Sequence, residues 1–121
     1  MSGRYWSFVA TLGAAVVLLV TTTTVAQDQG QVREFTISGN RYAFSPSSLT
    51  VNRNDLVTIT FTAHDLPHSF TIDDYRIAKR AGTGQAVTFE FRADRPGTFT
   101  FYCNLSLDEK CKDMKGTLTV K

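Results

Sequence analysis

The chain has 121 residues, a length that suits a single domain. Its 13 basic residues nearly balance 11 acidic ones, and the net charge of +2 excludes a strong electrostatic case for nucleic-acid binding. No serine–histidine–aspartate set, glycine-rich phosphate loop or shared carboxylate pair is recognisable, so we expect a protein that is not an enzyme.

The first 26 residues have the composition of an export signal. Arg4 gives a positive start, residues 8–20 carry no charge, and Ala26 ends a plausible cleavage site. This layout is typical of a secretory signal peptide, because the apolar stretch is short for a membrane span. An uncleaved N-terminal membrane anchor is the alternative. Both place residues 27–121, the predicted domain, outside the cytoplasm, so we expect a periplasmic or secreted protein.

The rest of the chain consists mainly of short runs in which apolar and polar residues alternate. Such alternation, rich in β-branched and aromatic residues, predicts half-buried strands separated by turns. Six or seven strands at this spacing predict an all-β fold, a β-sandwich with Greek-key connections. The runs cover residues 32–38, 48–51, 56–62, 68–73, 86–92, 97–103 and 116–121.

Residues 73–85 are the least strand-like part of the domain, and we expect a loop or a single helical turn there. The segment carries Arg76, Lys79 and Arg80, a small basic cluster. Two interpretations of this cluster remain open. It is either a solvated loop or a docking spot for an acidic redox partner protein.

The side chains that could bind a metal are few and lie in two stretches. His64 and His68 stand close together, and Pro67 removes a backbone donor directly before His68. Cys103, Cys111 and Met114 lie between the last two predicted strands. A strand–loop–strand connection brings its two ends together, so the sulfur atoms can meet at one end of the sandwich. A neighbouring strand that begins at His68 would add an imidazole there.

Thiolate, imidazole and thioether groups together form a soft ligand set. Soft donors select copper, zinc or iron–sulfur clusters over magnesium or calcium. A site of histidine and cysteine with a weak axial methionine is typical of a copper electron-transfer centre. The residue types therefore favour copper as the cofactor.

Three stretches carry a resemblance to the cupredoxin superfamily. The run YAFSPSSLTVNRNDLVTITF (42–61) resembles the opening of small cupredoxins. DLPHSF (65–70) resembles the first-histidine segment of cytochrome c oxidase subunit II and of nitrous-oxide reductase. PGTFTFYC (96–103), followed by MKGTLTV (114–120), resembles the ligand loop and last strand of cupredoxins generally. The resemblance covers residues 32–121 and implies a cupredoxin-like Greek-key β-sandwich.

Carried over residue by residue, the resemblance makes His68 the upstream histidine, Cys103 the bridging or equatorial cysteine and Met114 the axial methionine. The dinuclear copper loop reads Cys-x3-Cys-x3-His-x2-Met, but here Leu107 and Cys111 occupy the second cysteine and the histidine positions. The blue-copper loop also supplies a histidine, and none follows Cys103. A standard site of either kind therefore lacks a ligand.

Two substitutes for the missing ligand are open, Cys111 itself or His64. The two cysteines also allow a metal-free interpretation, because thiols in an oxidising compartment are expected to pair. A disulfide between Cys103 and Cys111 would stabilise the fold by about 2–3 kcal/mol in the chain-entropy model.

We predict an exported copper-binding protein for one-electron transfer to a redox partner protein. Its metal ligands are His68, Cys103, Cys111 and Met114, with His64 as a further candidate. The alternatives are a copper carrier or store that holds Cu(I), and a metal-free interaction module stapled by the Cys103–Cys111 disulfide.

Overall fold

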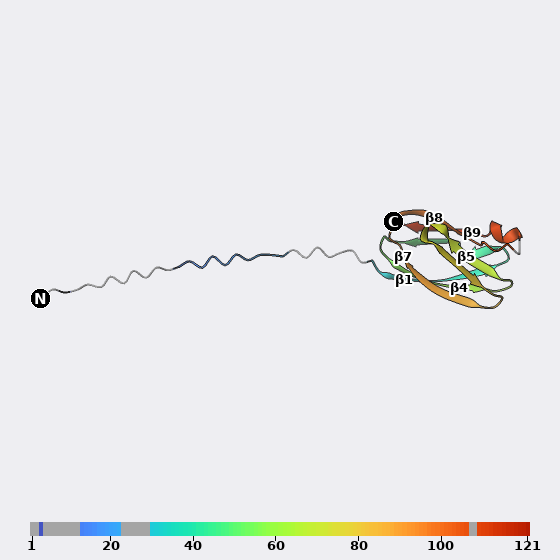
Figure 1. Ribbon diagram of the computed structural model, residues 1–121, viewed down its shortest axis with the longest axis horizontal. Coiled ribbons are helices and arrows are strands. Elements are labelled where there is room, and N and C mark those ends of the chain that lie inside the picture. Colours follow the sequence, from blue (N-terminus) through green and yellow to red (C-terminus); the bar gives the residue numbers. More distant parts are fainter. Residues whose placement is uncertain (1–2, 4–12, 23–29, 107–108) are drawn as a thin grey trace.

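The computed structural model describes residues 3, 13–22, 30–106 and 109–121. Nine strands in two sheets and two 3₁₀ turns make up the domain within these residues, which confirms the predicted all-β sandwich (Figure 1). Residues 13–22 contain neither helix nor strand, and none of the helical segments described has the length and apolar character of a membrane span. The predicted cleavage point after Ala26 lies outside the described residues.

The four-stranded sheet has the order β2-β1-β4-β7. Alternation is clearest in β4, where Val57, Ile59, Phe61 and Ala63 are buried and the threonines between them are partly exposed. One face of this sheet therefore supplies half of the core, as a period-two pattern requires. The strands are β1 (Val32–Asn40), β2 (Ala43–Ser45), β4 (Leu56–Ala63) and β7 (Ala86–Arg92).

The five-stranded sheet has the order β3-β9-β8-β5-β6. All five residues of β5 are buried, and the strand lies between β8 and β6. The first residue of β5 is His68, which explains why an imidazole lies inside the fold. The strands are β3 (Ser48–Val51), β5 (His68–Ile72), β6 (Ile77–Ala81), β8 (Gly97–Tyr102) and β9 (Lys115–Val120).

The structure corrects the sequence prediction at two strands, β2 and β6. The turn expected within residues 73–85 exists as η1 (Asp73–Tyr75), but residues 77–81 form a strand rather than a loop. Both missed strands lie at sheet edges. An edge strand needs no alternating pattern, and β6 exposes three consecutive residues, which include Lys79 and Arg80.

Aromatic side chains fill the space between the sheets. Phe70 stacks on Phe101 with ring centroids 4.7 Å apart, and Phe44 meets both rings edge-on. The ring of Phe101 lies against Gly116 of β9, and a Cβ atom at Gly116 would overlap this ring. Burial of each phenylalanine contributes about 1.5–3 kcal/mol, so this cluster is a main source of the packing between the sheets.

Candidate functional site

Strand register brings the candidate ligands to one end of the five-stranded sheet. Thr71 of β5 lies opposite Tyr102 of β8, and Tyr102 lies opposite Lys115 of β9. The start of β5, the end of β8 and the start of β9 are therefore neighbours. His68 begins β5, while Cys103 directly follows β8 and Met114 directly precedes β9.

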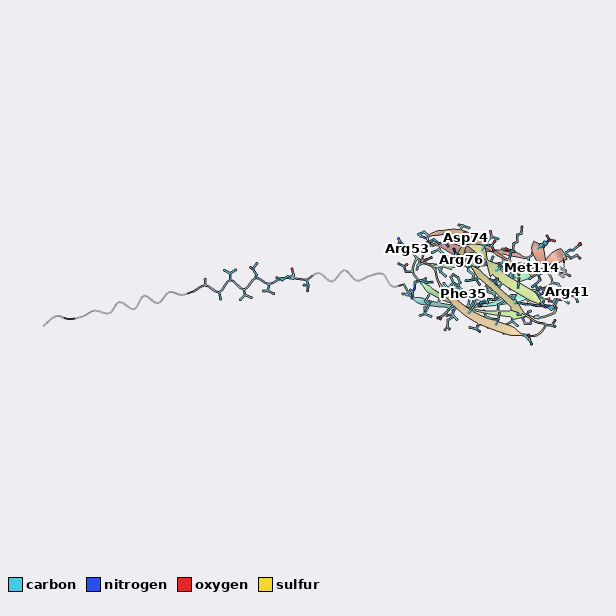
Figure 2. All side chains as sticks on the ribbon, viewed as in Figure 1. Phe35, Arg41, Arg53, Asp74, Arg76 and Met114 are labelled. Atoms are coloured by element: carbon cyan, nitrogen blue, oxygen red, sulfur yellow. A yellow bond between two sulfur atoms is a disulfide. The ribbon has the colours of Figure 1, made fainter. Side chains whose placement is uncertain are left out.

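This end of the sandwich carries η2 (Glu109–Asp113) and lies away from the C-terminus (Figure 1). Arg41 and Met114 lie towards it, whereas Arg53 lies towards the opposite end (Figure 2). Met114 is fully buried. Its thioether is thus available only to groups inside the fold.

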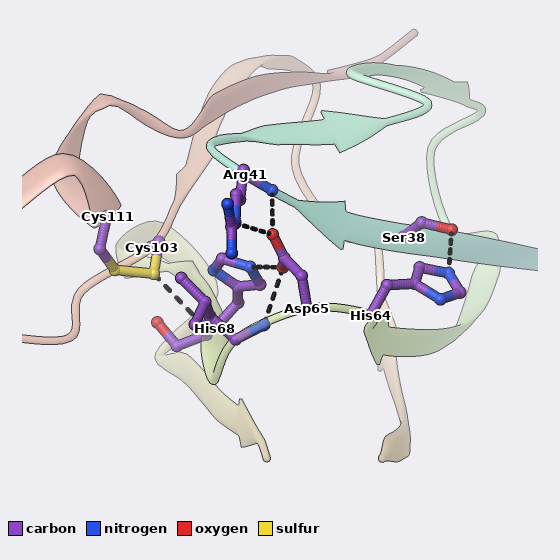
Figure 3. A network of polar contacts seen from close by, with 9 residues as sticks. Ser38, Arg41, His64, Asp65, His68, Cys103 and Cys111 are labelled. Atoms are coloured by element: carbon purple, nitrogen blue, oxygen red, sulfur yellow. Dashed lines mark hydrogen bonds and ion pairs between the residues drawn. A yellow bond between two sulfur atoms is a disulfide. The ribbon is translucent and has the colours of Figure 1, made fainter. Parts of the chain in front are cut away.

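The two cysteines are joined to each other as a disulfide, which is one of the states that the sequence left open (Figure 3). Both are buried, so neither sulfur atom meets solvent. The backbone N–H of Cys103 donates to the carbonyl of Met114 at 3.2 Å, and the N–H of Met114 donates to the carbonyl of Cys111 at 3.1 Å. These bonds fix Met114 beside the disulfide.

Each sulfur atom also accepts a backbone hydrogen bond. The N–H of Ser69 donates to Cys103 Sγ at 3.4 Å, and the N–H of Leu105 donates to Cys111 Sγ at 3.2 Å. Such donors stabilise a thiolate more than a neutral sulfur atom, because hydrogen bonds to a charged form favour that form. Each sulfur atom therefore already has one backbone donor that would favour its thiolate form.

His68 reaches the same end of the sandwich and is buried, with 1% of its surface exposed. Its Nε2 atom lies 2.8 Å from Asp65 Oδ1. Asp65 in turn forms an ion pair with Arg41, whose Nε atom lies 3.1 Å from Oδ2. Figure 3 shows the imidazole between Asp65 and the disulfide.

Asp65 remains ionised over the whole physiological range. Partial burial tends to raise its pKa, but hydrogen bonds from His68 and from the backbone N–H groups of Arg41 and Leu66 outweigh this effect and lower the pKa to about 2. The histidine therefore faces a permanent negative charge.

His64 is in a different position from the other candidates. It follows β4, is exposed, and its Nε2 lies 3.3 Å from the Oγ of Ser38. In Figure 3 it lies on the far side of Asp65 from the cysteines. Of the five residues singled out in the sequence, His68, Cys103, Cys111 and Met114 therefore lie together, and His64 lies apart.

The site as the structure presents it offers little to a metal ion. Among the described residues, no three side chains of histidine, cysteine, aspartate or glutamate are grouped so as to hold one. The disulfide removes both thiolates and leaves the imidazole of His68 and the thioether of Met114. Reduction of the disulfide would free two sulfur donors, each with a backbone N–H partner already in place.

Asp65 and Arg41 were not identified from the sequence. An aspartate three residues before a histidine, in Asp65-Leu66-Pro67-His68, is the signal that could have pointed to the first. No local signal points to Arg41, because it lies 24 residues from Asp65 and reaches it only through the fold.

Comparison with known proteins agrees with this architecture. The family model described as "Cupredoxin-like domain" matches residues 11–120. Nitrous-oxide reductase from Stutzerimonas stutzeri is 28% identical over 101 residues, which cover 80% of this chain but only 16% of the reductase.

Several solved structures are similar in fold, among them the following two. Dithionite-reduced auracyanin from Roseiflexus castenholzii has a TM-score of 0.60 and 22% identity, covering 76% of this chain and 97% of that one. A mixed-disulfide intermediate between a thioredoxin-like protein and subunit II of cytochrome c oxidase has a TM-score of 0.62 and 14% identity, covering 74% and 81%. At these identities the likeness shows the fold alone.

Proposed function

Because the chain belongs to the cupredoxin-like domain family, we propose that it is an exported copper-binding protein that exchanges single electrons with a redox partner protein. His68, Cys103, Cys111 and Met114 hold the copper in its reduced, dithiol form. Bound copper supplies a one-electron couple between Cu(II) and Cu(I).

The observation that carries the proposal is the meeting of an imidazole, two sulfur atoms and a thioether at one buried end of the sandwich. His68 precedes Ser69, whose N–H donates to Cys103, and Met114 is hydrogen-bonded through its backbone to both cysteines. Three strands and one loop contribute to this arrangement, so the positions of the donors do not depend on a flexible segment alone. A soft ligand set of this kind suits copper in both oxidation states.

Copper binding requires the disulfide to be opened first. A dithiol reductant gives two electrons and two protons to the Cys103–Cys111 bond, which yields two thiols here and a disulfide on the reductant. Subunit II of cytochrome c oxidase, a structural neighbour, is recorded in a mixed disulfide with a thioredoxin-like protein, which supports a reductant of that class. Both cysteines are buried, so the side chains that cover them must move before a partner's thiol reaches either sulfur atom.

Titration with copper tests the proposal directly. Reduced protein is expected to bind copper, and the Cu(II) form is expected to show an intense sulfur-to-copper absorption band that survives repeated reduction and reoxidation. Oxidised protein is expected to bind none, because its sulfur atoms are bonded to each other. Stoichiometric Cu(I) binding without the band would indicate a carrier or store instead.

Two substitutions at position 111 separate the ligand role of the cysteine from its structural role. Cys111→Ser removes one proposed ligand and the disulfide together, so we expect weaker copper binding and an altered band. Cys111→His restores the imidazole that the loop of related copper proteins carries and serves as the positive control. Unchanged binding in Cys111→Ser would show that Cys111 is not a ligand.

A metal-free interaction module is the second candidate, and the disulfide itself favours it. Cys103 and Cys111 are paired and buried, as expected for a structural staple. For this candidate, mass spectrometry without reductant shows two hydrogens missing, and the reduced protein takes up no copper. Copper binding by Cys111→His but not by the native chain would then show that the fold can host the metal while this sequence does not.

A further inference from the structure

The Asp65 carboxylate is held rigidly on both of its oxygen atoms. Oδ1 accepts a hydrogen bond from the backbone N–H of Leu66 at 2.8 Å and faces His68 Nε2. Oδ2 accepts one from the backbone N–H of Arg41 at 3.0 Å and pairs with the guanidinium of the same residue. Donors on both sides prevent the carboxylate from rotating away from the imidazole.

We propose that Asp65 is a positioning residue that selects the tautomer of His68 and so reserves its Nδ1 atom for the metal. An ionised carboxylate only accepts hydrogen bonds, so the Nε2 atom facing it must carry the proton. A neutral imidazole has one N–H, which leaves the lone pair on Nδ1. The inference rests on the proposed function, because it concerns the histidine of that same site.

Packing around the imidazole keeps the ring in this orientation. His68 is buried, and its Cδ2 atom faces Gly39, where an added Cβ would lie 3.1 Å away. Nε2 is directed at Asp65, and the ring lies between that carboxylate and the cysteines (Figure 3). Metal-binding histidines generally donate the N–H of their other ring nitrogen to a partner, which fixes the tautomer and the ring orientation.

The substitution Asp65→Asn is the sharpest test, because it preserves shape and changes only the hydrogen-bonding pattern. Oδ2 receives two donors from Arg41, its backbone N–H and its guanidinium, whereas Oδ1 receives one backbone donor, from Leu66. The amide oxygen is therefore expected to remain on the Arg41 side, at the cost of the Leu66 hydrogen bond. The amide NH₂ then faces His68 Nε2, which must accept instead of donate. An exchange of this kind beside a histidine can preserve the geometry and select the other tautomer.

The first measurement uses metal-free, disulfide-bonded protein at about pH 8, where exposed imidazoles are mostly neutral. Nitrogen NMR of the imidazole is expected to show the Nε2–H form of His68 in the native chain and the Nδ1–H form in Asp65→Asn. His64, which is exposed, provides an internal reference in the same spectrum. An unchanged tautomer in folded Asp65→Asn would overturn the inference.

The second measurement is the Cu(I) affinity of the reduced protein. We expect Asp65→Asn to weaken it by about 10–100-fold, the usual effect of losing a partner of a metal-binding histidine. Asp94→Asn is the matched control, because that carboxylate also pairs with an arginine, at 3.7 Å from Arg95 Nε, and is exposed. Equal affinities in the two variants would contradict the proposed role of Asp65.

The two measurements keep this inference distinct from the proposed function. A native chain that binds no copper refutes the copper function, whereas the tautomer is determined without any metal. If Asp65→Asn does not fold, Asp65→Ala replaces it in the tautomer measurement. Without the carboxylate, His68 is expected to show a mixture of the Nε2–H and Nδ1–H forms. A pure Nε2–H form in folded Asp65→Ala would overturn the inference equally.

Discussion

Asp55 and Thr71 are both buried polar residues, but they differ in their partners. Asp55 accepts backbone hydrogen bonds from Gln31 and Asn52, each at 2.8 Å, and lies 3.4 Å from Arg33 Nε. The Oγ1 atom of Thr71 has no partner among the described residues. A buried polar group stabilises a fold only when it is hydrogen-bonded, so these two residues should respond to substitution in opposite ways.

The stability contributed by Asp55 should depend on pH. The backbone N–H groups of Gln31 and Asn52, together with Arg33, hold the pKa of this carboxyl below its ordinary value of 3.8. A depressed pKa stabilises the fold above the unfolded value and loses that effect as the pH falls through the folded one. Asp55→Asn is therefore expected to cost about 1–3 kcal/mol at neutral pH.

Urea unfolding of the native chain and of Asp55→Asn from neutral to acidic pH checks this expectation. The difference in the free energy of unfolding should shrink once the pH falls below about 4. A difference that stays constant down to pH 2 would show that ionisation of Asp55 does not contribute.

Thr71→Val should stabilise the protein. Valine has nearly the shape of threonine and removes a buried hydroxyl without a partner, so we expect a gain of about 1 kcal/mol. Ser69→Ala is the comparison with the opposite sign, because Ser69 Oγ donates to Asn104 Oδ1 at 2.6 Å and accepts from its N–H at 2.8 Å. Thermal unfolding of both variants measures the difference, and a loss in Thr71→Val would show that the hydroxyl has a partner in solution.

At the scale of the elements, the hairpin formed by β8 and β9 couples the core to the candidate site. Phe101 of β8 is part of the aromatic cluster, while Cys103 and Met114 lie just beyond the two strands. Alternation in the sequence predicted both strands. It did not show that the ring of Phe101 requires a glycine, Gly116, at the opposite position of β9.

Gly116→Ala should be costly because of this packing. Its Cβ would overlap the ring of Phe101, which is fully buried and cannot move aside. We expect a loss of about 1–3 kcal/mol, as for other cases of overpacking. Gly82→Ala is the matched control, since its Cβ would meet only the end of the Gln85 side chain. Equal unfolding midpoints in urea for the two variants would argue against this packing.

The substitution Gly116→Ala should also affect the candidate metal site. Gly116 stands two residues after Met114, so displacement of β9 is expected to weaken copper binding by the reduced chain as well. This second effect ties the packing of one element to the proposed function.

At the scale of the whole molecule, the proposed copper binding would link stability to the state of the cysteines. Reduction of the Cys103–Cys111 disulfide is expected to cost about 2–3 kcal/mol, because the unfolded chain loses a constraint. A ligand that binds only the folded, reduced form then raises its stability by mass action. Copper should therefore compensate for the lost disulfide.

Thermal unfolding of the reduced chain with and without Cu(I) measures this linkage. At a free copper concentration 100 times the dissociation constant, the gain should be about 2.7 kcal/mol. The disulfide form should not respond, and neither should a variant in which both cysteines are replaced by serine. An equal response of all three forms would show that copper binds elsewhere.

The sequence by itself determined the fold class and most of the strands, because alternation along a strand is a local property that burial on one face imposes. It also identified the residues that meet at the candidate site, through their spacing around the last two strands and their resemblance to a family. The sequence did not predict the edge strands β2 and β6. An edge strand has a neighbour on one side only, so it does not need the alternation by which a strand is recognised.

Only the tertiary structure decided how those residues are arranged. It joined Cys103 to Cys111, set His64 apart at Ser38, and placed Asp65 and Arg41 around His68. These contacts link residues that are distant in the chain or depend on which way a side chain points. Their energies follow from distance and burial in three dimensions, which no local pattern of residues encodes.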